Sequence, residues 1–313
     1  MIHDMIFISA VSPLHCGAGE GLGIIDRPVM RERTTNFPII PGSTLKGVLR
    51  DEYASIGKSV VDALFGPMDD GSKYAGCVSF SDAALFAFPI RSLKGSFVWA
   101  TSALVLYRLQ RIIEVAGLEA SFPNLKNLLA KRELSSESTR VLINPDAKST
   151  LLIDAPAASG GSKILLEEFS LPNADLPGLK EFASEISTFI FGAGSAFATE
   201  FTQKLVVLPE DRFNYFVTYA TEVVPNIKID DETGTSKEGL RYSEYLPTET
   251  VLYCLASFDK TLAAGASKEL DQDKKVKAFL VTEKPKKVIQ IGADGTKGKG
   301  FVKINFVSEV AKK

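Results

Sequence analysis

Apolar residues occur along this chain in short runs that predict β-strands near both ends. Residues 4–11 (DMIFISAV) and 251–258 (VLYCLASF) are rich in apolar and β-branched side chains, a composition typical of buried strands. The same pattern predicts further strands at residues 76–82, 163–171, 288–292 and 301–307.

Other segments space their apolar residues with a helical period. Between residues 43 and 55, Leu45, Leu49 and Tyr53 fall close to one helical face, with Lys46 and Arg50 elsewhere on the helix. Similar segments predict helices at 102–116, 175–193, 209–219 and 267–282. Irregular alternation of the two element types predicts an α+β fold whose first and last strands share one sheet. The sequence contains no internal repeat or clear linker, so residues 1–313 are expected to form a single domain.

Residues 223–246 predict a long β-hairpin that projects from the domain. Two extended arms flank a polar tip at residues 230–238 that contains Gly234. Segment 228–244 holds five acids against three bases, which disfavours a position along phosphates. If the chain binds nucleic acid, this hairpin would better suit wedging between bases or contacting a neighbouring subunit than lying along phosphates.

Overall composition narrows the function without assigning it. The net charge is −2 and the pI is about 5.9, so any nucleic-acid site must rest on a local patch. Three scattered cysteines argue against a disulfide framework and a structural zinc site, and two histidines cannot build a multi-histidine centre. No apolar run reaches about 18 residues. A cytoplasmic protein with no membrane segment is expected.

The glycine-rich stretch at residues 15–23 (HCGAGEGLG) cannot form a regular element. Gly17, Gly19, Gly21 and Gly23 match neither the dinucleotide fingerprint GxGxxG nor a Walker A loop. The stretch is either a loop whose backbone approaches a ligand closely or a flexible surface turn.

Residues 41–50 (PGSTLKGVLR) suggest a phosphate site at a helix start. Ser43 or Thr44 is the expected N-cap, and Lys46 would then lie in the first turn, where a cation is unfavourable unless an anion binds. Segment 27–50 carries five cations against the single acid Glu32. The five are Arg27, Arg31, Arg33, Lys46 and Arg50. The alternative is a solvated basic face.

The C-terminal segment 284–303 holds six lysines, among them Lys297 and Lys299, against one acid, Asp294. Its glycines permit close backbone approach, so the loop could clasp a phosphate backbone without reading bases. An exposed hairpin kept in solution by lysines is the alternative.

These segments together resemble the RAMP superfamily, and in particular the backbone subunit of type III-B (Cmr) CRISPR complexes. The resemblance is most specific in LHCGAGEGLGIIDRPVMRERTTNFPIIPGSTLKGVLRDEY (14–53). Residues 79–102, IDDETGTSKEGLRYSEYLP (229–247) and IGADGTKGKG (291–300) look like the later blocks of the family. The matches extend from residue 8 to about residue 302.

The resemblance implies a modified RRM-like (ferredoxin-like) core with insertions, from which the hairpin 223–246 projects as a thumb. Several copies would stack on a CRISPR RNA in a helical filament with other Cmr subunits. Each thumb would displace a base pair of the guide–target duplex, and the subunit would cut the target RNA there with a divalent metal, Mg²⁺ being expected.

The family pattern also assigns residues. Asp26 is the implied catalytic acid, either holding the metal or acting as general base on a 2′-hydroxyl, with His15 and Glu238 as further catalytic candidates. The implied RNA-binding residues are Gly17, Gly19, Arg27, Arg31, Ser43, Lys46, Arg50, Tyr242, Lys297 and Lys299. Two alternatives remain: a scaffold that holds guide RNA without cutting, and the related type III-A backbone subunit.

Overall fold

The structure is a computed structural model. It describes residues 1–21, 23–69, 73–134, 139–154, 161–230, 232–263, 270–283 and 288–310, without the side chains of residues 228, 229, 237, 238, 309 and 310. The described strands form a 12-stranded mixed sheet and a separate two-stranded hairpin. The main path of the sheet is β13 (Val288–Gln290), β14 (Phe301–Phe306), β1 (Ile2–Ala10), β12 (Val251–Phe258), β4 (Ala83–Arg91), β5 (Phe97–Ser102), β9 (Leu205–Leu208), β6 (Val141–Ile143), β8 (Phe169–Asp175) and β7 (Lys163–Leu166). Beside this path, β2 (Ile39–Ile40) pairs with β4 and β3 (Val78–Phe80) pairs with β12.

Strand β1 lies inside the sheet, between β12 and β14, and it is antiparallel to both. Its residues from Asp4 to Ala10 are all buried, as expected for a strand covered on both faces. The pairing of β1 with β14 confirms the expectation that the first and last strands share one sheet. Residues 11–31 follow β1 and residues 291–300 precede β14 in the sequence. Because β1 and β14 are antiparallel neighbours, the two segments lie at the same edge of the domain.

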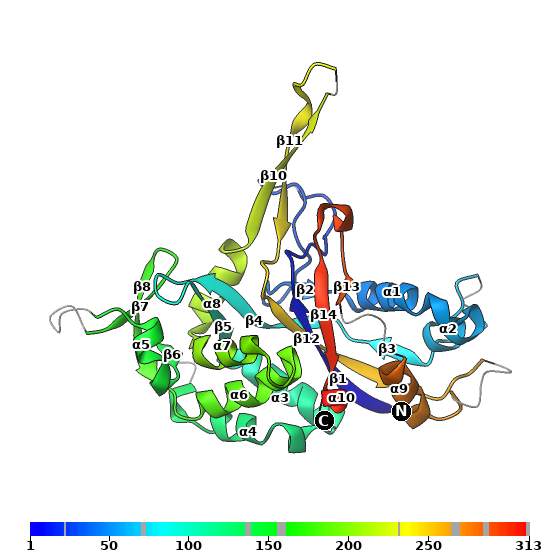
Figure 1. Cartoon of the computed structure of the whole chain (residues 1–313), viewed down its shortest axis with the longest axis horizontal. Helices are drawn as coiled ribbons and strands as arrows, with labels where there is room; N and C mark the ends of the chain where they lie inside the picture. Colours follow the sequence, from blue (N-terminus) through cyan, green and yellow to red (C-terminus); the bar gives the residue numbers. More distant parts are fainter. Residues whose placement is uncertain are drawn as a thin grey trace.

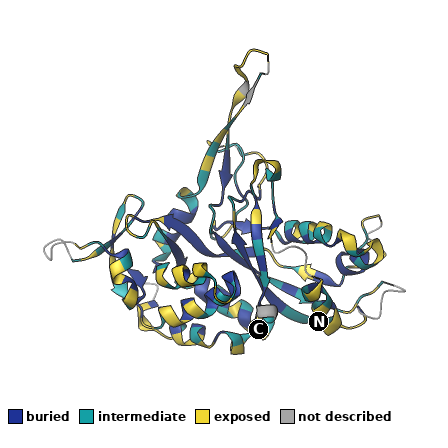
Figure 2. Ribbon diagram, in the orientation of Figure 1, coloured by how far each residue is buried: buried dark blue, intermediate teal, exposed yellow. Residues whose placement is uncertain are grey.

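Helices cover the sheet, and the inner strands are buried beneath them (Figure 2). The described helices are α1 (Gly42–Glu52), α2 (Lys58–Phe65), α3 (Ala103–Ala116), α4 (Pro123–Leu129), α5 (Lys148–Leu151), α6 (Leu179–Phe191), α7 (Ala196–Lys204), α8 (Glu210–Tyr219), α9 (Asp273–Thr282) and α10 (Val307–Val310). The bounds of α3 have a local cause: Ser102 caps its first turn through Val105 N–H, and Gly117 ends it in the left-handed conformation. Within the described ranges, no helix is both long and apolar enough to cross a membrane.

The projecting hairpin predicted at residues 223–246 is confirmed. Strands β10 (Glu222–Ile229) and β11 (Ser236–Tyr245) pair antiparallel and rise from the edge of the sheet as a narrow arm (Figure 1). The root of the arm is buried, whereas Val223, Ile227 and Leu240 are exposed. We call this hairpin the thumb.

One predicted strand was wrong. Residues 163–171 form two antiparallel strands, β7 and β8, instead of one. The chain reverses at Glu167, which takes a left-handed φ of 47°. The sequence KILLEEFSL has no glycine, proline or asparagine at that point, so its continuous apolar pattern concealed the turn.

Candidate functional site

The glycine-rich stretch folds as a hairpin-like loop closed by backbone hydrogen bonds. Met30 N–H donates to the Cys16 carbonyl at 2.7 Å, and Ala18 N–H donates to the Pro28 carbonyl at 3.0 Å. Gly19 has a φ of 95°, which favours glycine at this position. We call residues 15–31 the glycine loop; its tip includes Asp26.

The thumb root holds one side of the glycine loop. Arg27 N–H donates to the Tyr242 carbonyl at 3.0 Å, and Glu244 N–H donates to the Arg27 carbonyl at 3.0 Å. The C-terminal glycine segment, residues 291–300, holds the other side, because Ala293 N–H donates to the His15 carbonyl at 2.9 Å. A Cβ added to Gly292 would lie 2.2 Å from that carbonyl oxygen, so the contact requires glycine. Three segments distant in sequence thus meet at one place.

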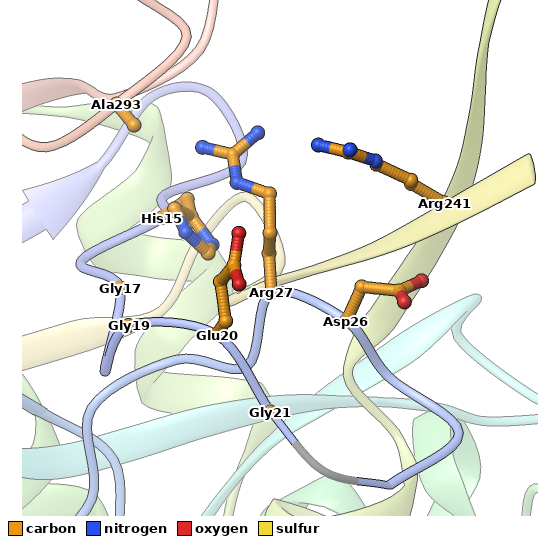
Figure 3. Close-up of a pocket in the computed structure, with 9 residues that line it drawn as sticks. All are labelled: His15, Gly17, Gly19, Glu20, Gly21, Asp26, Arg27, Arg241 and Ala293. Carbon is orange, nitrogen blue, oxygen red and sulfur yellow. The ribbon is translucent and has the colours of Figure 1, made fainter. Parts of the chain in front are cut away.

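A cavity of about 630 Å³ lies where these segments meet. It is lined by His15, Gly17, Gly19, Glu20, Gly21, Asp26, Arg27, Arg241 and Ala293. Figure 3 shows the Arg27 guanidinium between His15 and Arg241, with the Asp26 carboxylate on the thumb side of the loop. The cavity therefore combines two guanidinium groups with two carboxylates, those of Glu20 and Asp26.

Asp26 is half-buried and fixed by the thumb. Its Oδ2 accepts a hydrogen bond from Tyr242 N–H at 2.7 Å. Among the described residues, Oδ1 accepts no hydrogen bond. One oxygen thus fixes the carboxylate, and the other remains able to accept a proton or bind a cation. The arrangement suits a general base or a metal ligand, and it also ties the loop to the thumb.

Asp294 connects all three segments. Its Oδ2 accepts hydrogen bonds from Tyr245 Oη at 2.8 Å and from Arg27 Nη1 at 3.2 Å, and Lys297 Nζ lies 3.3 Å from Oδ1. Burial alone would raise the pKa of the Asp294 carboxyl, but the hydrogen bond from Tyr245 and the charges of Arg27 and Lys297 together lower it. Burial, followed by the hydrogen bond to Asp294, raises the pKa of Tyr245. Asp294 is therefore an ionised acceptor beneath the cavity.

His15 is buried and firmly oriented. Its Nδ1 lies 2.6 Å from the Glu244 carbonyl oxygen, which assigns a proton to Nδ1 because a carbonyl oxygen only accepts. A Cβ on Gly17 would lie 2.7 Å from Nε2, so Gly17 allows the ring its place. Arg31, by contrast, is used inside the protein: Nη2 lies 2.6 Å from the buried Glu244 carboxylate and Nη1 donates to two backbone carbonyls.

The helix start at residues 41–50 differs from the prediction. Helix α1 begins at Gly42, so neither Ser43 nor Thr44 is its N-cap, and Ser43 is an exposed residue of the first turn. The Gly42 N–H donates to Asp82 Oδ1 at 2.7 Å, so a carboxylate from the β3–β4 connection already meets the helix N-terminus. The reason for the error is that this capping acid is distant in sequence.

The two α1 cations have different surroundings. Arg50 contacts the Asp62 carboxylate and the Gly66 carbonyl within the protein. Lys46 is half-buried and makes no ion pair with the described residues. Neither residue lines the cavity, so the structure separates them from the glycine loop with which the sequence grouped them.

The remaining predicted residues lie around the thumb root. Lys297 contacts Asn226 of β10 at 3.3 Å, and Lys299 Nζ lies 5.0 Å from the centroid of the Tyr245 ring. Tyr242 contributes its backbone to the site. The side chain of Glu238 lies outside the described residues.

Sequence reasoning missed Glu20, Arg241 and Asp294. Side chains alternate along β11, so Arg241, Ser243 and Tyr245 lie on one face. On that face Ser243 contacts Arg27, and Tyr245 contacts Asp294. That alternation, applied to the predicted thumb, is the signal that could have identified Arg241.

The cavity offers a metal ion only a partial set of ligands. Within the described ranges, no group of three His, Cys, Asp or Glu side chains could hold a metal. Mg²⁺ is commonly bound by one or two carboxylates, with substrate phosphates and water completing its shell. Asp26, whose Oδ1 accepts no hydrogen bond from the described residues, fits that mode as a single protein carboxylate, with the substrate supplying the remaining oxygens.

Comparison with known proteins places the chain among close relatives. The family model of the RAMP superfamily matches residues 7–303. The CRISPR system Cmr endoribonuclease Cmr4 of Pyrococcus furiosus is 33% identical over 308 residues, covering 96% of this chain and 95% of the relative. The crystal structure of oligomeric Cmr4 from the same organism superposes with a TM-score of 0.70 at 27% identity, covering 98% of each chain. The Cms endoribonuclease Csm3 of Streptococcus thermophilus is 35% identical over only 86 residues, covering 23% of this chain and 39% of the relative.

Proposed function

Because this chain belongs to the RAMP superfamily, as a Cmr4-type backbone subunit of type III-B CRISPR complexes, we propose that it binds CRISPR RNA in a filament and cuts complementary target RNA there. The observation that carries the proposal is the convergence of three segments on one cavity that holds both guanidinium groups and the Asp26 carboxylate. The match to the Cms endoribonuclease Csm3 covers only 23% of this chain, whereas the match to Cmr4 covers 96%, which favours the type III-B assignment.

The topology supports the finer assignment of a ferredoxin-like core. Strands β14, β1, β12 and β4 are neighbours in that order, and every pair is antiparallel. In chain order these are the fourth, first, third and second strands of the core. In the chain, α1 lies between β1 and β4, α3 follows β4 and β5, and α9 lies between β12 and β14. The segment from β5 to β9 and the thumb would be its insertions.

RNA binding follows from charges that face outward at the cavity and the thumb root. Arg27 and Arg241 line the cavity and Lys297 contacts Asn226 at the thumb root, although the chain as a whole is slightly acidic. Contacts of this kind hold a backbone without reading bases, which suits a guide whose sequence is read by pairing. The partners we propose are CRISPR RNA, the target strand, further copies of this chain and other Cmr subunits.

The thumb has the surface of a wedge. Ile227 and Leu240 are 54% and 50% exposed, and the tip carries acids that phosphates would repel. Apolar side chains can pack on the faces of unstacked bases. We therefore assign the thumb to the displacement of a base pair, which would present the target backbone to the cavity at its root.

Cleavage would then proceed by attack of a 2′-hydroxyl on the adjacent phosphorus. The oxygen–phosphorus bond to the next nucleotide breaks as the new one forms, and the departing oxygen takes up a proton. Asp26 would either accept the proton of the 2′-hydroxyl or hold a Mg²⁺ that stabilises charge on the phosphate. Arg27 would stabilise the same charge by hydrogen bonds. His15, fixed through Nδ1, would act as a positioning residue through Nε2.

The test uses complexes reconstituted with guide RNA and a labelled complementary target in Mg²⁺. Asp26→Asn keeps an oxygen for the Tyr242 N–H but loses the charge, whereas Asp26→Ala loses both. We expect regularly spaced cuts from the wild type, none from either variant, and unchanged target binding by Asp26→Asn. The isolated chain is expected to be inactive, because the substrate is a duplex distorted by the filament.

Full cleavage by an assembled Asp26→Asn complex would contradict the catalytic role. It would leave a guide-binding scaffold or move the chemistry to His15 or Glu238. Replacing Mg²⁺ by a chelator distinguishes the two roles of Asp26: cleavage that persists favours the general base.

A further inference from the structure

We infer that Asp294 is a positioning residue that aims the Arg27 guanidinium at the scissile phosphate, an inference that rests on the proposed function. Asp294 lies in the C-terminal glycine segment, 267 residues from Arg27 in the sequence, and its Oδ2 accepts from Arg27 Nη1 at 3.2 Å. Its side chain is 11% exposed, whereas that of Arg27 is 33% exposed and borders the cavity. The acid is therefore inside and the cation lies between it and the solvent.

The contact uses only part of the guanidinium. Nη1 makes the hydrogen bond to Asp294 and a longer one of 3.5 Å to Ser243 Oγ. Nε and Nη2 make no hydrogen bond with the described residues. A guanidinium fixed through one nitrogen has fewer orientations to lose when its other nitrogens bind a phosphate.

Asp294 is itself held rigidly. It has a left-handed φ of 61°, and its carboxylate is shared by Tyr245 Oη and Lys297 Nζ. Tyr245 belongs to the thumb root, so the thumb and the C-terminal segment both determine, through Asp294, where the Arg27 guanidinium lies. A movement of the thumb on RNA would thus be transmitted to the cation beside Asp26.

Loss of Asp294 should not release Asp26 itself. The glycine loop keeps its backbone bonds to Tyr242 and Glu244, and Asp26 keeps its bond to Tyr242 N–H, none of which involves Asp294. The Glu244 carboxylate also holds the loop through Val29 N–H and Arg31. The effect of Asp294 on cleavage should therefore pass through Arg27.

The experiment is a double-mutant cycle on reconstituted complexes, measuring the single-turnover cleavage rate at saturating target and the Kd for target RNA. We expect Asp294→Ala to slow cleavage about tenfold in the wild-type background and to change the Kd less than about twofold. In an Arg27→Ala background the same change should alter the rate by less than about twofold. Asp294→Asn, which keeps an oxygen acceptor for Tyr245 and Arg27, should lie between the wild type and Asp294→Ala.

Asp175→Asn is the matched control, because Asp175 pairs with Lys148 on the peripheral part of the sheet, and its rate should equal that of the wild type. An Asp294→Ala rate equal to the wild type would overturn the inference, as would a tenfold loss that persists without Arg27. If Asp294→Ala fails to assemble, Asp294→Asn decides in both backgrounds. A wild-type complex that binds target without cutting it would overturn the proposed function as well, and is distinguished by its own rate.

Discussion

Arg27 and Arg50 are both paired arginines in a segment that the sequence marks as basic, yet their surroundings differ. The Arg50 side chain is 16% exposed, and its guanidinium donates hydrogen bonds to the Asp62 carboxylate and the Gly66 carbonyl inside the protein. Arg27 is 33% exposed and uses one nitrogen on Asp294, with the rest of its guanidinium at the cavity. The first pair serves the fold, and the second leaves a cation available to a ligand. The difference lies in the partners, which the local charge count does not reveal.

The largest expected effect tests the structural half of this comparison. Arg50→Ala leaves the poorly exposed Asp62 carboxylate without its cation, which should lower the free energy of unfolding by about 3 kcal/mol. Urea unfolding of the purified chain measures it. Lys148→Ala is the matched control, since its pair with Asp175 is exposed and should contribute less than about 1 kcal/mol. Equal losses in the two variants would erase the distinction.

The functional half predicts the opposite profile for Arg27. Arg27→Ala should slow target cleavage about 100-fold, equivalent to about 2.7 kcal/mol of transition-state stabilisation, because one charged donor to the phosphate is lost. Its unfolding free energy should change by less than about 1 kcal/mol, because the guanidinium is partly exposed and Asp294 keeps Tyr245 and Lys297 as partners when it is removed. Single-turnover kinetics and urea unfolding of the same preparation check both. If Arg27→Ala cleaves target at the wild-type rate but is destabilised, Arg27 stabilises the fold, as Arg50 does, and does not act on the phosphate.

A smaller effect is expected from the lysines of the C-terminal glycine segment. Lys297→Ala and Lys299→Ala together should weaken RNA binding about tenfold, uniformly across guide sequences, because phosphate contacts carry no sequence information. The slope of log Kd against log salt should fall by roughly one to two. Filter binding over a salt series measures this. A loss confined to particular guides would indicate base contacts instead.

The smallest expected effect concerns the start of α1. Asp82 already meets the helix N-terminus, so an anion there would gain less than the sequence suggested. Lys46→Ala should therefore weaken guide binding only about threefold, roughly the effect of one exposed phosphate contact. If Lys46→Ala weakens binding more than the double lysine variant, the helix start is the principal RNA contact and the comparison must be reversed.

The sequence predicted the elements whose evidence is local. The run VLYCLASF coincides with β12, because a short, nearly continuous apolar run marks a buried strand. The segment 102–116 corresponds to α3, because its apolar residues recur with a helical period. It failed where the decisive partner is distant. Asp82 caps α1 from 40 residues away, and Asp294 reaches Arg27 across 267 residues. No periodicity encodes such contacts, so they become visible only when the sheet brings the segments together.

The resemblance of motifs identified the family and the neighbourhood of the site, and the cavity places His15, Gly17, Asp26 and Arg27 together. It did not distinguish Arg31 and Arg50, which form ion pairs with the buried acids Glu244 and Asp62, from Arg27. Burial of the partner decides this difference, and a motif that records only the arginine cannot show it. The roles of Asp26, Glu238 and the metal stay predictions.

The place of β1 between β12 and β14 has a consequence for how the protein is made. During synthesis, β1 emerges long before either neighbour exists, so its apolar strand must wait while most of the chain is translated. The segment that carries Asp294 is translated long after β1 and immediately before β14. A chain whose synthesis stops before this segment would lack β14, which pairs with β1, and the C-terminal glycine segment, which lines the cavity through Ala293. Unfinished copies would thus be recognisable to chaperones and proteases, and unfit to enter a filament.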